Sequence, residues 1–223
     1  FALLPINIAA VFRLHLELQF DLLALLIAGE FANATALANG GERLVLTGAN
    51  GTIRDFSYND RFPWPESPDG DGPSLVLIDP DANPDHAVAT NWRASVGGMG
   101  SLGAGDSVPF VGDPEADADD DGLSAFAEHA FGTSDSSPNS PDVLVAQFLG
   151  GAFSVTYPRN LAADDALISV EVSTNLNTWV APVETGSGGE IHNGDGTATF
   201  TINYPSTLSA GERFFVRLRV TSR

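Results

Sequence analysis

The 223-residue chain lacks cysteine altogether, and it also lacks lysine. Without cysteine it can form neither a disulfide framework nor a thiolate zinc site. Its 10 basic residues are all arginine, and they face 29 acidic residues, which leaves a formal net charge of −19. The negative electrostatic field of such a charge repels phosphate backbones and anionic lipid, so we expect no nucleic-acid partner and no membrane insertion. The same field attracts divalent cations.

The chain also lacks an uncharged apolar run of about 18 residues, the length that a membrane helix needs. Its most apolar stretch, residues 1–28, is interrupted by Arg13, Glu17 and Asp21. This stretch has neither the basic start nor the small-residue cleavage site of a signal peptide. Because the chain begins with Phe1 rather than Met, we expect it to be a fragment of a longer protein. Its hydrophobic content of 43% is enough for a buried core.

The most informative segment runs from Asp117 to Glu128 and fits the calcium-loop pattern D-x-D-x-D-G-x5-E without a departure. Calcium takes about six to eight oxygen ligands, and a loop of this spacing supplies them by position. Asp117, Asp119 and Asp121 are expected to give one carboxylate oxygen each. Leu123 is expected to give its backbone carbonyl, and Glu128 both oxygens of its carboxylate.

A solvated acidic linker is the alternative interpretation of this aspartate run. Two details favour the metal: Gly122 stands where the loop must turn sharply, and apolar residues at helical spacing follow the loop. Gly132 suits the end of that helix, and Ala125, which has no ligand atom, is expected to leave its position to a water. Residues 111–114 make a poor entering helix, so the sequence predicts a single loop with an exit helix only.

The patterning divides the chain into four parts. Residues 1–29 are expected to be a separate N-terminal segment of helical or undetermined structure, in which a helix is predicted over residues 6–18. Residues 30–105 are predicted to form a first β domain, and residues 106–141 an acidic linker that carries the calcium loop. Residues 142–223 are predicted to form a second, small antiparallel β-sandwich. We expect the two β domains to fold separately.

Alternating apolar and polar residues predict the strands of both β domains. In the first domain, strands are expected over residues 42–46, 52–58 and 74–78, with an Asn-Gly turn typical of a hairpin after the first. In the second domain, strands are expected over residues 153–157, 167–172, 197–202 and 213–220. The last of these strands has one apolar face, formed by Phe214, Val216, Leu218 and Val220.

Residues 30–105 resemble the C-terminal part of a bacterial lamin tail domain, and several short segments carry the resemblance. These segments are Gly29-Glu30-Phe31, LANGGERL (37–44), Tyr58-Asn59-Asp60, Pro63-Trp64-Pro65, DGDGPSL (69–75) and Asn91-Trp92-Arg93-Ala94-Ser95. The resemblance implies a truncated immunoglobulin-like β-sandwich from a large secreted or cell-surface protein, because the opening strands of the family are missing here. Leu102 also stands where the family usually has proline.

Two further segments resemble parts of the same kind of bacterial protein. The calcium segment, continued by Glu128-His129-Ala130-Phe131-Gly132-Thr133, is similar to thrombospondin type 3-like or dockerin-like loops. Residues 170–179 and 215–218 resemble the β domain that commonly follows such loops at a C-terminus. These resemblances imply export and assign no catalytic residue.

Other patterns give weaker indications of chemistry. Residues 98–103 spell G-x-G-x-x-G, but the segment after them cannot begin a helix, so no dinucleotide site is expected. Neither H-E-x-x-H nor G-x-S-x-G occurs. The Asp85–His86 pair is better explained as a solvent-facing loop than as a catalytic pair, and Asp69 and Asp71 as turn residues rather than a second ion site. The three tryptophans are expected in the core or as lids rather than as sugar platforms.

The sequence therefore predicts a mainly β protein with a partial immunoglobulin-like sandwich, an EF-hand-like calcium loop with a short exit helix, and a second β-sandwich. We expect a non-catalytic, structural or adhesive calcium-binding region of a secreted or cell-surface bacterial protein. Its expected partners are calcium and a cell-surface protein or polysaccharide. The alternative is an accessory part of an exported hydrolase whose catalytic domain lies elsewhere. A calcium sensor is disfavoured, because the chain has one loop and no methionine-rich groove.

Overall fold

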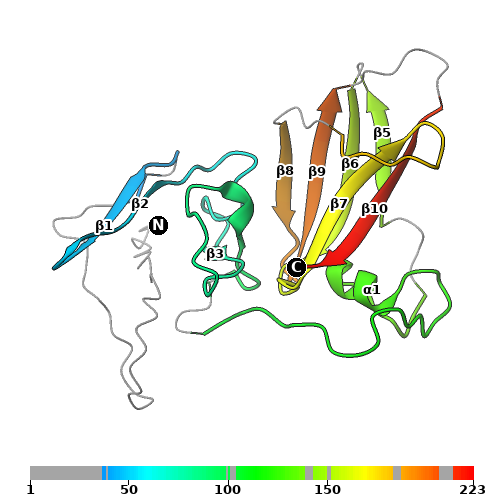
Figure 1. Ribbon diagram of the computed structural model, residues 1–223, viewed down its shortest axis with the longest axis horizontal. Coiled ribbons are helices and arrows are strands. Elements are labelled where there is room, and N and C mark those ends of the chain that lie inside the picture. Colours follow the sequence, from blue (N-terminus) through cyan, green and yellow to red (C-terminus); the bar gives the residue numbers. More distant parts are fainter. Residues whose placement is uncertain are drawn as a thin grey trace, which may run out of the picture.

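The computed structural model describes residues 37–38, 40–98, 100, 104–138, 143–149, 152–182, 187–205 and 213–223. The helix predicted over residues 6–18 lies outside these ranges. The described part is mainly β, with antiparallel sheets and one short α-helix (Figure 1). It contains no helix with the length and apolarity of a membrane span.

The N-terminal part contains two small antiparallel pairs. Strands β1 (Arg43–Gly48) and β2 (Gly51–Ser57) form the predicted hairpin around Asn50. Gly51 has a φ of 117°, a conformation that favours glycine. Strand β3 (Leu75–Leu77) pairs with β4 (Trp92–Ala94), which follows a short 3-10 turn, η2 (Ala89–Asn91). The sequence patterning predicted β3 but not β4.

Two antiparallel sheets make up the C-terminal part. The larger has the order β5-β6-β9-β8, and the smaller pairs β10 with β7. Their strands are β5 (Val145–Leu149), β6 (Ala152–Asn160), β7 (Ala166–Ser173), β8 (Ser187–His192), β9 (Thr197–Pro205) and β10 (Phe215–Ser222). The strands predicted over residues 153–157, 167–172, 197–202 and 213–220 are confirmed as β6, β7, β9 and β10, whereas β5 and β8 were not predicted.

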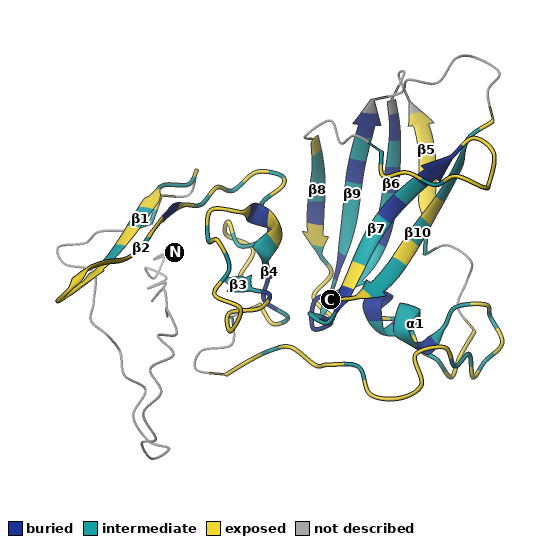
Figure 2. Ribbon diagram, in the orientation of Figure 1, coloured by how far each residue is buried: buried dark blue, intermediate teal, exposed yellow. Residues whose placement is uncertain are grey.

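The two C-terminal sheets share one hydrophobic core (Figure 2). Alternate residues of β6, β7 and β9 point into it, as period-two patterning requires. Its buried residues are Phe153, Val155, Tyr157, Val170, Val172, Ile202 and Tyr204. Phe214, Val216 and Leu218 pack against them, which confirms the apolar face predicted for the last strand. Val220 packs further along, against a small cluster of alanines.

The N-terminal part contacts the core-facing side of the larger sheet near β8. The ring of Phe62 packs against this core and lies next to Gly188 of β8. A Cβ on Gly188 would lie 2.6 Å from the Thr201 backbone oxygen and 2.9 Å from Phe62 Cδ2, so there is no room for a side chain. Ala94, Leu161 and Ala198 form a second buried cluster that joins β4 to the C-terminal part. Whether residues 30–105 and 142–223 fold independently stays a prediction.

Candidate metal centre

Three carboxylates of the predicted calcium loop converge. One carboxylate oxygen from each of Asp117, Asp119 and Asp121 lies within 4.8 Å of the other two. Backbone N–H groups hold the carboxylates in place: Gly122 donates to Asp117 Oδ2 at 3.0 Å, and Leu123 donates to Asp121 Oδ1 at 2.9 Å. The segment therefore folds as a tight loop around its aspartates rather than as an extended acidic linker.

The turn at the middle of the loop depends on two left-handed residues. Gly122 has a φ of 92°, a conformation that side-chain-bearing residues rarely adopt. Asp120, at φ 60°, is the other one, and aspartate tolerates this region better than most residues. Asp120 takes no part in the group of three, as the spacing predicts.

The predicted exit helix is α1 (Ala125–Phe131). Ser124 caps its start by accepting the Ala127 N–H at Oγ, and Gly132 ends it in the left-handed conformation with a φ of 78°. The helix packs against β6, β7 and β10 at one end of the two sheets. This packing fixes the direction in which Glu128, on the helix, is presented.

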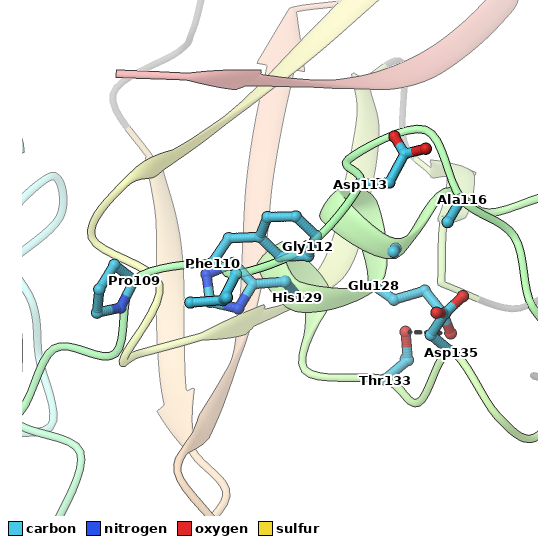
Figure 3. Close-up of a pocket in the computed structure, with 11 residues that line it drawn as sticks. Pro109, Phe110, Gly112, Asp113, Ala116, Glu128, His129, Thr133 and Asp135 are labelled. Atoms are coloured by element: carbon cyan, nitrogen blue, oxygen red, sulfur yellow. Dashed lines mark hydrogen bonds between the residues drawn. The ribbon is translucent and has the colours of Figure 1, made fainter.

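Glu128 is buried, with 1% of its surface exposed, and it lies outside the group of three aspartates. Its Oε1 accepts a hydrogen bond from Thr133 Oγ1 at 3.2 Å. Asp135 and Glu128 line the same cavity (Figure 3). Asp135 Oδ1 also accepts the N–H of Ala118, inside the loop, at 3.0 Å. The chain thus turns back after α1 and brings another acid to the loop.

Sequence reasoning missed Asp135. It lies in a run of serine, threonine and proline that indicates a spacer, seven residues beyond the end of the calcium pattern. The Gly132 helix end was the only indication that the chain reverses direction here. A carboxylate placed shortly after such a reversal is a reasonable candidate for an additional ligand.

The donor chemistry fits a hard divalent cation. The group of three offers carboxylate oxygens only, which suits calcium or magnesium rather than a metal that prefers imidazole or thiolate. The buried Oδ2 atom of Asp119 has no hydrogen-bond partner among the described residues. A buried carboxylate oxygen without a partner is costly, and a bound cation removes that cost.

A cavity of about 390 Å³ lies against α1, beside residues 117–128, which we name the metal loop (Figure 3). Glu128, Thr133 and Asp135 line one side of it, while the rings of Phe110 and His129 line another. These rings meet edge to face at 5.5 Å, and His129 Nε2 lies 2.9 Å from Asp165 Oδ1. The helix that carries Glu128 is thereby attached to the turn between β6 and β7.

Comparisons of the chain with protein-family models, curated proteins and solved structures find no match. The site must therefore be interpreted from its own geometry and chemistry.

The weaker indications from the sequence have structural explanations. His86 Nδ1 lies 2.8 Å from the carbonyl oxygen of Pro84, and Asp85 Oδ1 accepts the Ala87 N–H, so each side chain is engaged within its own loop. Trp92 stacks on the buried Phe56. Among the described residues, Asp69 and Asp71 join no group of three possible metal ligands.

Proposed function

We propose that this chain is a structural, calcium-binding region of a secreted or cell-surface bacterial protein. The observation that carries the proposal is the convergence of Asp117, Asp119 and Asp121 within 4.8 Å, around a glycine in the left-handed conformation. These features coincide with the positions that the calcium-loop spacing predicts.

In this proposal the three aspartates give one oxygen each and Leu123 gives its backbone carbonyl. Glu128 supplies a bidentate carboxylate from the first turn of α1. Asp135 is the additional candidate ligand, because it lines the same cavity as Glu128 and its carboxylate accepts a hydrogen bond from the backbone of the loop. A bound calcium ion supplies positive charge at the point where these acids meet.

The physical role of the ion follows from the charges. Carboxylates held this close repel one another, which disfavours the closed loop. Extracellular modules bind calcium with dissociation constants on the order of 10⁻⁴–10⁻³ M. At millimolar calcium, binding then stabilises the folded form by only about 0.4–1.4 kcal/mol. This is enough to order a loop and its exit helix, but too little to hold a domain together.

The remaining features of the proposal concern the flanking parts. We propose that β1–β4 belong to a truncated immunoglobulin-like sandwich of the lamin tail type, and that the two C-terminal sheets form a second sandwich. The shared core between the two sheets supports the latter. The motif resemblance supports the former and also export, with a cell-surface protein or polysaccharide as the adhesive partner.

Calorimetric titration of the full chain with calcium tests the proposal. We expect one site, and we expect Glu128→Gln to weaken it at least tenfold by removing the bidentate ligand. Asp135→Asn should weaken it less, because it removes one charge at the edge of the site. Asp120→Asn is the matched control, since it removes one charge from the loop at a position without a ligand role. Equal effects of Glu128→Gln and Asp120→Asn would show diffuse cation attraction and refute the site.

A further inference from the structure

Five residues between β6 and β7, residues 161–165, contact the N-terminal part, the linker and helix α1. Leu161 is fully buried against Ala94 of the N-terminal part. The carbonyl oxygen of Ala162 accepts the Val108 N–H of the linker at 2.8 Å. Ala163 packs against Ala130 of α1. We name residues 161–165 the hub turn.

The two aspartates at the end of the hub turn hold different partners. Asp164 accepts two hydrogen bonds from Arg93 of β4, to Oδ1 from Nε at 2.6 Å and to Oδ2 from Nη2 at 2.7 Å. Such a bidentate arginine–carboxylate pair is strong and geometrically specific. The side chain of Arg93 is 1% exposed and that of Asp164 is 10% exposed, so the pair is shielded from water.

Arg93 also ties the linker to this pair. Its Nη2 donates to Asp106 Oδ1 at 2.7 Å, and Asp106 Oδ2 accepts the Val96 N–H at 3.0 Å. One buried guanidinium therefore joins β4, the start of the linker and the hub turn. Its position depends on both aspartates, because a buried arginine that loses its partners is strongly destabilising.

Asp165 holds the helix of the metal loop. Its Oδ1 lies 2.9 Å from His129 Nε2, and its Oδ2 accepts the Phe110 N–H at 2.7 Å. His129 directly follows Glu128, the proposed bidentate ligand on the same short helix. A shift of α1 that brings Glu128 to a metal ion must also move the group that contacts Asp165.

We propose that the hub turn couples calcium binding to the docking of the β3–β4 pair on the C-terminal sheets. The route runs from Glu128 to its neighbour His129, across to Asp165, and from the adjacent Asp164 to Arg93. The inference rests on the proposed calcium site and assigns Arg93, Asp164 and Asp165 as positioning residues. None of them is a metal ligand.

Thermodynamic reciprocity makes the proposal measurable. If calcium favours the docked arrangement by some factor, then docking favours calcium binding by the same factor. A variant that weakens docking must therefore bind calcium more weakly, although the substitution lies outside the metal loop. Electrostatics alone predicts the opposite for loss of an arginine, because the chain becomes more negative and attracts calcium more strongly.

The experiment is calcium titration of full-length Arg93→Gln and Asp165→Asn. We expect each to lower the calcium affinity about fivefold or more, which is the lower range of measured couplings between sites. The matched controls are Arg43→Gln and Asp55→Asn, which break an exposed ion pair of the β1–β2 hairpin and change the net charge equally. Affinities of Arg93→Gln and Asp165→Asn equal to those of their controls would overturn the coupling.

Hydrogen exchange of the unmodified chain, with and without calcium, gives a second test whose main comparison needs no variant. Calcium should slow exchange of the amides of β3 and β4 as well as those of the loop, and Glu128→Gln should abolish both effects. Slowing confined to residues 117–135 would overturn the proposed coupling through the hub turn, while leaving the proposed calcium site intact. Failure of the unmodified chain to bind calcium would instead refute the proposed function.

Discussion

Glu190 is a buried acid that faces the core side of β8, opposite Phe200 of β9. Its Oε1 accepts a hydrogen bond from Ser67 Oγ at 3.0 Å. Burial raises the pKa of Glu190 above its ordinary value of 4.5, and this effect exceeds the opposing effects of Ser67 and Arg159. The charge of Glu190 therefore destabilises the contact between the N-terminal part and the larger sheet.

Glu190→Gln is expected to raise the free energy of unfolding at pH 7, because it keeps the acceptor for Ser67 and removes a charge whose burial cost exceeds its attraction to Arg159. Since the folded pKa lies above the unfolded one, the folded protein binds the proton more tightly. The contribution of Glu190 to stability is thus complete below pH 4.5 and is lost as the pH rises through the folded pKa. Urea unfolding at pH 7 and at pH 4 measures the stability with Glu190 ionised and with Glu190 protonated.

The gain from Glu190→Gln should disappear toward pH 4, where the glutamate is itself protonated. The exposed Glu115→Gln serves as the control for a general change in net charge. A gain of the same size at both pH values would point to packing rather than to ionisation.

At the scale of elements, α1 has seven residues and is too short to be stable by itself. It depends on its capping residues and on the burial of Ala130 and Phe131. Gly132 at its end combines a left-handed backbone with close packing, because a Cβ there would lie 2.7 Å from Thr197 Cγ2. The Thr197 hydroxyl is held by Asp195 at 2.7 Å, so its methyl group cannot easily move aside.

Gly132→Ala is therefore expected to destabilise the fold by roughly 2–3 kcal/mol, from the left-handed conformation and the steric overlap together. Gly194→Ala is the matched control, because its φ of 82° is similar and its Cβ would meet nothing within 4 Å. That control should lose only about 1 kcal/mol. Urea unfolding at fixed calcium compares the two, and equal losses would contradict the steric account.

In the C-terminal part, the strands that the sequence predicted are β6, β7, β9 and β10, whose side chains alternate over a shared core. Strand β8 was missed because its sequence begins Ser187-Gly188-Gly189, and Gly188 is required by the backbone oxygen of Thr201 on β9 and by the ring of Phe62, both distant in sequence. Strand β4 was missed because Arg93 looks exposed until Asp164 and Asp106 are in place. Local patterning does not contain such long-range partners.

In the candidate site, too, local spacing was predictable from the sequence and long-range contacts were not. The spacing of the loop predicted the group of Asp117, Asp119 and Asp121, because ligands on one short loop are fixed by local geometry. Asp135 was missed because it reaches the loop only after α1 has formed and the chain has reversed. The ligand roles of Leu123 and Glu128 stay predictions that the titration described above tests.

At the scale of the whole molecule, charge and exposure are unevenly distributed. Acidic residues are concentrated in residues 106–142, which contain no arginine, whereas Arg217 and Arg219 lie on the last strand, where both contact Glu171. Residues 108–115 are mostly exposed, and Val111 is 91% exposed. This linker is held mainly by the hub turn and, in our proposal, by calcium.

Limited proteolysis of the calcium-free chain is expected to cut first within residues 106–141, and calcium should slow that cut. Elastase is the suitable protease, because the linker offers alanine and valine but no site for trypsin. Glu128→Gln is expected to be cut at the same rate with and without calcium. First cleavage inside β7, between Leu167 and Val172, would show that the C-terminal sheets open before the linker does.

The ion pair between Arg93 and Asp164 joins positions separated by 71 residues. A ribosome makes Arg93 first, and the guanidinium has no buried place to occupy until the hub turn has been synthesised and the strands around it have paired. Burying the arginine earlier, without its carboxylates, is strongly unfavourable. The contact between Arg93 and Asp164 also forms late, because the chain entropy lost in closing so long a segment precedes any gain from the contact. The β3–β4 pair, although made early, is therefore among the last parts of the chain to reach its final position.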